Sequence, residues 1–97
     1  MKIYTVTTVC NTVHPPDVRC WGYYLSLDEA ASVAESDKCG LHEEGYWPWI
    51  VIEAVSPGIY SVADSEQYWY LYSDENRGFV PCTKPDWAQN VVGWGIG

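Results

Sequence analysis

The sequence predicts an α+β fold, in which a small antiparallel sheet of about five to six strands carries one helix on one face, in the order β-β-α-β-β-β-β. Two patterns predict it. Several short segments are rich in β-branched and aromatic residues and alternate in polarity, as strands do. One segment alone places alanines at helical spacing. We find no repeat and no linker in the 97 residues, so we expect a single domain over residues 1–97.

Two strands are expected before the helix. The segment Lys2–Cys10 (KIYTVTTVC) is β-branched and alternating, and Arg19–Leu25 (RCWGYYL) is expected to return antiparallel to it. The intervening Asn11–Asp17 contains two adjacent prolines, which cannot donate to a strand ladder, so it is expected to be a loop. Gly22 inside the second strand indicates a bulge or a close backbone contact.

The helix is expected to begin after Ser26, because Ser26 and Glu29 have the spacing of a capping box. Lys38 near the last carbonyls and Gly40 in a left-handed conformation are expected to end it. One apolar stripe, expected to lie close against the sheet, is formed by Leu27, Ala30, Ala31 and Ala34.

Four further strands are expected after an acidic connector at Leu41–Gly45. They are Trp49–Val55, Ile59–Ala63, Gln67–Ser73 and Phe79–Thr83. Asp74–Gly78 reads as a hairpin connection in which Gly78 can supply a positive φ. The end of the chain, Val91–Gly97, is expected to be an edge strand or a mobile tail.

Aromatic residues make up 15% of the chain, which is more than a core of this size is expected to hide. One helix covers one face of a sheet, so the other face is expected to stay wet or to be covered by a second subunit. Tyr68, Tyr70 and Tyr72 alternate along one strand and are candidates to line that uncovered face. We therefore expect a homo-oligomer.

The net charge of -8 argues against two classes of partner, general nucleic-acid sites and anionic membrane surfaces. A general nucleic-acid binder needs a cationic stripe, and an anionic membrane surface attracts basic segments. No apolar run reaches the roughly 20 residues of a membrane span. No secretory leader follows Met1, so we expect a cytoplasmic protein.

The four cysteines form no CxxC pair, and in the cytosol they are expected to be reduced thiols. The spacing of Cys10 with His14 and of Cys39 with His42 leaves a Cys2His2 zinc site as an alternative. Cys39 beside His42 also leaves a nucleophile with its base as an alternative. No other catalytic or nucleotide-loop motif is present, so we expect neither an enzyme nor a cofactor.

Several segments of the sequence together show a resemblance: MKIYTVTTV, GYYLSLDEA, WIVIE, GIY, YWY, FVPCTKP and GWGIG. In these segments the chain resembles a family of short, uncharacterised proteins encoded by bacteriophages and prophages. The resemblance covers most of the chain in fragments, but not the loop before Arg19 or the connector after Cys39. It implies an accessory protein of a bacterial host cell, of a kind that often acts against host defences.

The first functional hypothesis is sequestration of a small nucleotide-like immune signal. Aromatic rings would stack on the base and ribose, and the only two arginines would hold phosphate. The candidate ligand-binding residues are Arg19, Arg77, Tyr68, Trp69, Tyr70, Tyr72, Trp47 and Trp49.

The alternative is an acidic inhibitor, in effect a nucleic-acid mimic, that binds a basic surface of a CRISPR or restriction effector or another defence complex. Its candidate partner-binding residues are Glu43, Glu44, Asp74 and Glu75. The simpler explanation is that the acidic residues only keep an aromatic-rich protein soluble.

Overall fold

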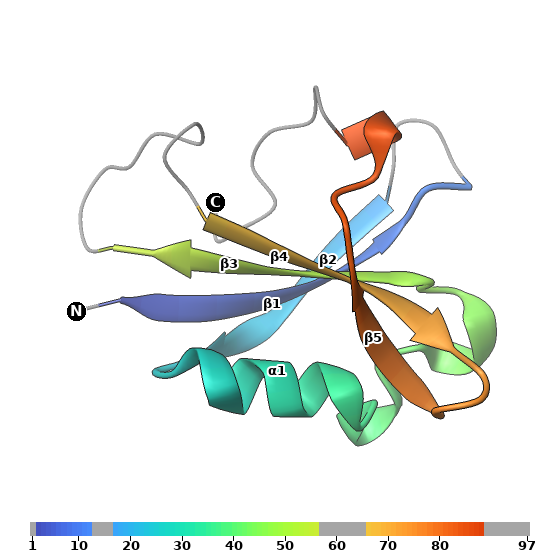
Figure 1. The fold of residues 1–97 in the computed structure, drawn as a ribbon, viewed down its shortest axis with the longest axis horizontal. Helices are drawn as coiled ribbons and strands as arrows, with labels where there is room; N and C mark the ends of the chain where they lie inside the picture. The colour runs from blue at the N-terminus through green and yellow to red at the C-terminus, as the bar shows by residue number, and fades with distance from the viewer. Residues whose placement is uncertain (1, 13–16, 57–65, 89–97) are drawn as a thin grey trace.

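The computed structural model describes residues 2–12, 17–56 and 66–88, apart from the side chains of Cys39 and Glu44. Over this part of the chain it has a five-stranded antiparallel sheet and one α-helix, so the predicted α+β class is confirmed (Figure 1). The strands are β1 (Ile3–Cys10), β2 (Asp17–Tyr24), β3 (Trp49–Val55), β4 (Glu66–Ser73) and β5 (Gly78–Cys82), and the helix is α1 (Leu27–Glu35). Short 3-10 helices are η1 (Lys38–Gly40), η2 (Glu43–Gly45) and η4 (Asp86–Ala88).

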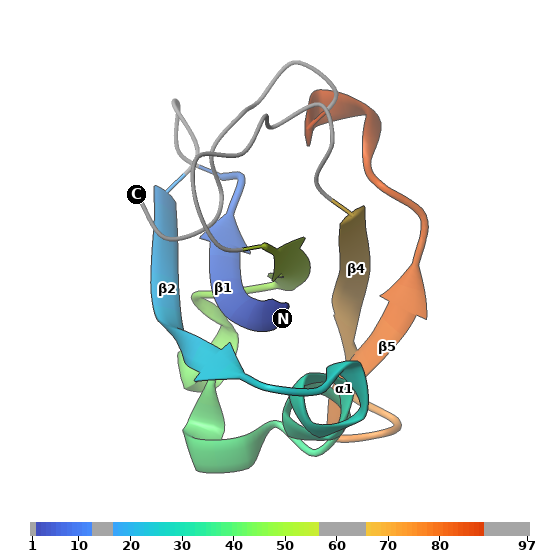
Figure 2. The same cartoon turned by 90° about the vertical axis from the view of Figure 1, so that its left-hand side faces the viewer.

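The strand order is β2-β1-β3-β4-β5, so β2 and β5 form the two edges of the sheet (Figure 2). Both β2 and β3 pair antiparallel with β1, and α1 connects them across its face. The helices of the described residues include none that is long and apolar enough to cross a membrane. The predicted strand Ile59–Ala63 and the tail Val91–Gly97 lie outside those residues, as does the middle of the first loop.

The helix begins as predicted, but its cap differs in detail from the usual capping box. The Glu29 amide donates to Ser26 Oγ at 3.2 Å, and the Ser26 hydroxyl donates to the Glu29 carboxylate at 3.1 Å. Ala30 and Ala34 are fully buried against the sheet. Their small side chains let the helix approach the strands closely, as the sequence indicates.

The predicted end of the helix is wrong. The helix stops at Glu35, and the first left-handed residue after it is Asp37 at φ 49°. Gly40 is left-handed as predicted, at φ 66°, but it lies beyond the helix. Aspartate tolerates this conformation because its short side chain bonds locally, and here Asp37 Oδ1 accepts from the His42 amide at 2.9 Å. Lys38 therefore lies beyond the helix and does not cap it.

The tyrosine stripe of β4 lies on the face that the helix covers, which corrects the expectation that it lines the uncovered face. Tyr70 is 6% exposed and packs with Ile50, Ile52 and the helix alanines. Tyr68 and Tyr72 are partly buried against the same cluster. The alternation was predicted correctly, but the period of a strand does not tell which of its faces meets the helix.

The opposite face is neither wet nor dependent on a second subunit at its centre. Val9 and Val51 are fully buried there with Trp69. The rings of Trp49, Trp69 and Trp87 meet edge to face in all three pairs, with centroids 5.5 to 6.3 Å apart. In Figure 1, α1 lies below the sheet and η4 above it. The sheet thus has a core on each face.

The hairpin turn between β4 and β5 corrects a further expectation. The positive φ of 52° belongs to Arg77, while Gly78 begins β5. Gly78 is needed for space, because an added Cβ would overlap the backbone carbonyl of Glu35 at the end of α1. The hairpin and the helix end are therefore in direct backbone contact.

We expect Gly78→Ala to destabilise the protein by about 1–3 kcal/mol, because neither backbone segment can withdraw from the added methyl group cheaply. Gly40→Ala is the comparison without a steric overlap, since the space around Gly40 is open and only its φ of 66° costs about 1–2 kcal/mol. Urea unfolding measures both. A Gly78→Ala protein as stable as the wild type would contradict this helix-to-hairpin contact.

Candidate functional site

A β-bulge in the edge strand β2 shapes the candidate site. The pairing of β1 with β2 shifts register between Val6 and Thr7, so that Val6 faces Gly22, Thr7 faces Cys20, and Trp21 is the extra residue. Because of this insertion, Trp21, Gly22 and Tyr24 all lie on the helix side of the strand. The bulge indicated by Gly22 in the sequence is confirmed.

A cavity of about 320 Å³ lies beneath the bulge, between β2 and the segment formed by α1 and η1. The missing side chain of Gly22 leaves room between the rings of Trp21 and Tyr24. Its lining residues are Val6, Trp21, Gly22, Tyr23, Tyr24, Val33, Lys38 and Leu41. The cavity is therefore mostly apolar and aromatic, with one ammonium group, as small-molecule sites generally are.

One cationic side chain lines this cavity, and a second contacts one of the lining rings. Lys38 is exposed and belongs to the lining. The Arg19 guanidinium lies 3.9 Å from the centre of the Trp21 ring, in a cation–π contact. Of the five basic residues of the chain, one therefore lines the cavity and one stacks on a ring that lines it.

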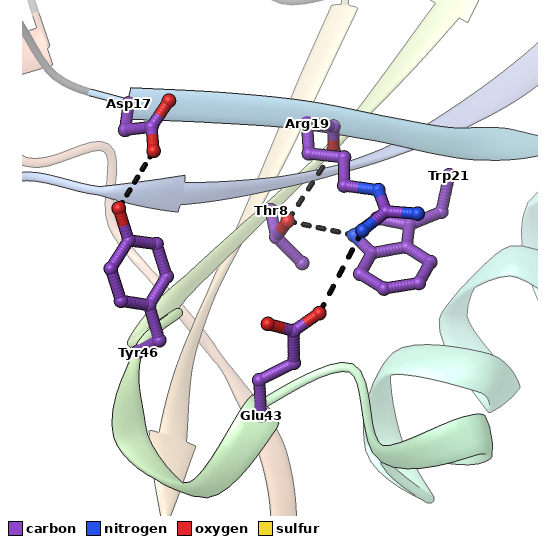
Figure 3. Close-up of polar contacts among 6 residues, drawn as sticks. All are labelled: Thr8, Asp17, Arg19, Trp21, Glu43 and Tyr46. Atoms are coloured by element: carbon purple, nitrogen blue, oxygen red, sulfur yellow. Dashed lines mark hydrogen bonds and ion pairs between the residues drawn. The ribbon is translucent and has the colours of Figure 1, made fainter.

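The η2 segment is joined to β2 by two polar contacts (Figure 3). Glu43 forms an ion pair with Arg19 at 3.8 Å, and the Tyr46 hydroxyl donates to Asp17 Oδ2 at 2.7 Å. Trp21 Nε1 donates to Thr8 Oγ1 at 2.8 Å, which fixes the indole ring over the sheet. Figure 3 shows the Trp21 ring between the η2 segment and α1.

The connector between α1 and β3 is held in place at its other side by His42. The His42 ring stacks on Tyr72 with centroids 3.5 Å apart and planes 4° from parallel, and it meets Phe79 edge to face. This contact anchors the segment that carries Lys38, Leu41 and Glu43 to β4 and β5. The connector is thus fixed at both edges of the sheet.

The candidate ligand residues predicted from sequence are not brought together. Arg19 lies on the edge strand β2, and Arg77 lies in the turn before the opposite edge strand β5. The stripe of Tyr68, Tyr70 and Tyr72 faces the helix, whereas Trp49 and Trp69 pack with each other on the other face.

Trp47 is only 5% exposed, and its ring meets Tyr46 edge to face. No described residue accepts a hydrogen bond from Trp47 Nε1. It does not line the cavity beneath β2.

The residues of the alternative hypothesis are also spread over two segments. Asp74 and Glu75 lie exposed in the turn between β4 and β5. Glu43 is engaged with Arg19, and the Glu44 side chain is not described.

The candidate zinc ligands are described only in part, because His14 and the Cys39 side chain lie outside the described residues. Cys10 is buried, and its thiol lies 3.0 Å from Thr12 Oγ1. His42 is stacked on Tyr72. Within the described ranges no three His, Cys, Asp or Glu side chains are grouped as a metal site requires. Cys10, Cys20 and Cys82 are free thiols.

Sequence reasoning missed Trp21, Tyr24 and Lys38 as site residues. The glycine between two aromatic residues in Trp21-Gly22-Tyr23 was the available signal, since it marks a strand with a gap in its side chains. In the sequence Lys38 has the position of a helix cap, and nothing near it in the chain indicates that it lines a cavity.

No protein-family model, curated protein or solved structure matches this chain. The resemblance to phage-encoded proteins stays a prediction.

The hydrogen bond to Asp17 raises the pKa of Tyr46 above the ordinary value of 10.0. Because the folded pKa is the higher one, this contact stabilises the protein below about pH 10 and is lost as the pH rises through the folded pKa. We expect Asp17→Ala to lower the pKa of Tyr46 towards its ordinary value, measured by an NMR titration of the tyrosine rings.

Tyr68 is the internal control for this titration. Its pKa is raised by a hydrogen bond to Glu66, which Asp17→Ala leaves intact. An unchanged pKa of Tyr46 in the variant would show that η2 is not joined to β2 through Asp17.

Proposed function

We propose that this chain is a non-catalytic binding protein that sequesters a small nucleotide-like ligand in the cavity beneath β2. The observation that carries the proposal is the cavity itself, which combines the rings of Trp21 and Tyr24 with the ammonium group of Lys38. Apolar and aromatic surface with one or two placed polar groups is suited to holding a ligand of this kind.

The chemistry of the lining supports a nucleotide-like ligand. A planar base can stack on an aromatic ring, and such stacking contributes about 1–3 kcal/mol per base in nucleic-acid complexes. Arg19 stacks on the Trp21 ring, where it can meet the phosphate of a nucleotide, and Lys38 adds a positive charge to the lining. The cavity of about 320 Å³ is at the small end of ligand sites, which favours a single nucleotide unit.

The net charge of -8 opposes an anionic ligand at long range, so the proposal depends on contacts at close range. Charges further away than about 8 Å are largely screened at physiological salt. At close range Lys38 in the lining and Arg19 on the Trp21 ring favour an anion. The nearby carboxylates of Glu43, Asp28 and Glu29 oppose it.

The biological setting is a separate part of the proposal. The resemblance to phage proteins supports a role in which the ligand is an immune signal of the bacterial host and sequestration counters its defence.

The outer face of β2 exposes Val18 by 40% and Tyr23 by 56%, and such apolar side chains on an edge strand support a homo-oligomer.

We expect native mass spectrometry of the protein purified from bacteria to show a bound small molecule that is released on denaturation.

Lys38→Ala is expected to weaken binding of adenosine monophosphate, the probe in calorimetry, by about tenfold, because one charged contact is lost. Lys2→Ala is the matched control, since Lys2 pairs with Glu66 away from the cavity lining.

A loss of binding in Arg77→Ala with none in Lys38→Ala would move the ligand to the β4–β5 turn and contradict the proposed site. A protein with a clean apo mass that binds no nucleotide would contradict sequestration altogether.

The second candidate function is an acidic inhibitor of a basic defence protein. The contact between Gly78 and the Glu35 carbonyl supports it, because it holds the turn with Asp74 and Glu75 against the end of α1. Carboxylates from two segments are thereby fixed at one end of the molecule, where they would meet a basic surface. A clean apo mass would favour this candidate.

A further inference from the structure

The side chain of Arg19 is oriented before any ligand arrives. Its guanidinium lies 3.9 Å from the centre of the Trp21 ring, and Trp21 Nε1 is itself held by Thr8. A guanidinium stacked on a ring keeps the N–H groups along its edge available, and these match two oxygens of a phosphate or carboxylate. Arg19 is thus a prepared anion-binding group.

In this structure Arg19 is paired with the carboxylate of Glu43, and the ion pair is weak. The closest oxygen lies 3.8 Å from the Arg19 Nη1, which is beyond hydrogen-bond distance. The two side chains are 57% and 43% exposed, so water screens the pair. Glu43 also has a φ of 47°, in the left-handed region that glutamate rarely adopts. A stronger anion can displace this carboxylate.

Charges at the other end of the site favour one orientation of a ligand. A second cavity shares Tyr24, Val33 and Lys38 with the first and is lined by the carboxylates of Asp28 and Glu29. An anionic group placed there would meet two like charges and one opposite charge, that of Lys38. An anion carried by a ring in the first cavity is therefore best placed towards Trp21 and Arg19.

From these contacts we infer that Glu43 is an internal competitor for Arg19, and that the phosphate of a nucleoside monophosphate takes its place when the base enters the cavity. The inference rests on the proposed function and deepens it, because it names the charged group that the site selects. Binding then exchanges one carboxylate for one phosphate on the same guanidinium.

The test is calorimetric titration of the full chain with two probes, adenosine monophosphate and adenosine. Glu43→Gln is expected to raise the affinity for adenosine monophosphate by about threefold to tenfold, because a charged competitor becomes neutral. The affinity for adenosine, which has no phosphate, is expected to stay unchanged. Glu35→Gln is the matched control, since it removes the same charge from an exposed position outside the cavity lining.

The pairing is isolated by a double-mutant cycle. In an Arg19→Gln background, Glu43→Gln is expected to give no gain in affinity for adenosine monophosphate, and the melting temperature of each variant verifies its fold. The same gain in Glu43→Gln and Glu35→Gln, or a gain that persists without Arg19, would overturn the inference. Equal binding of both probes by the wild type would overturn it too, yet leave an aromatic ligand site standing. Binding of neither probe would overturn the proposed function and, with it, this inference.

Discussion

The extra residue in β2 is the constraint on which the candidate site depends. Cys20 lies on the face of β2 that points away from the helix. If β2 were regular, Gly22 and Tyr24 would lie on that same face. The bulge at Trp21 shifts this alternation by one residue, so that Gly22 faces Val6 and Tyr24 joins Trp21 above the helix. Two aromatic rings with a glycine between them, opposite Val33 and Leu41, leave a cavity. The same irregularity breaks the regular edge of the sheet, as bulges in edge strands commonly do.

Packing on both faces of the sheet decides which aromatic side chains can meet a ligand. The tyrosines of β4 fill the space between the sheet and α1. On the other face the rings of Trp49, Trp69 and Trp87 pack against one another. A core on each side explains how a chain of 97 residues accommodates so many rings. Trp21 and Tyr24 differ because they lie on an edge strand and border a cavity on the side that faces α1 and η1.

Local patterns in the sequence predicted most of the described fold. The strand alternation, the Ser26 cap and the alanine stripe depend on neighbours in the sequence, and the structure has all of them. What depends on tertiary contacts was not predictable: which face of β4 meets the helix, the early turn at Asp37, and the close contact at Gly78. Glu53 is the clearest case. A carboxylate in a strand carries no local signal of burial, yet Glu53 is fully buried beside Gln67, whose amide lies 3.5 Å from its carboxylate. The site was missed for the same reason, because Lys38 and Trp21 are separated in sequence and meet only in the fold.

The central claim is that this chain binds a small nucleotide beneath the bulge of β2. An amide NMR titration with adenosine monophosphate tests it most directly, since a protein of 11.0 kDa gives one resolved signal for most residues. The account predicts that the shifted amides cluster at Trp21, Tyr24, Lys38 and Leu41, with the β4–β5 turn unaffected. Shifts that centre on Arg77 and the turn, or no shifts at millimolar nucleotide, would contradict it.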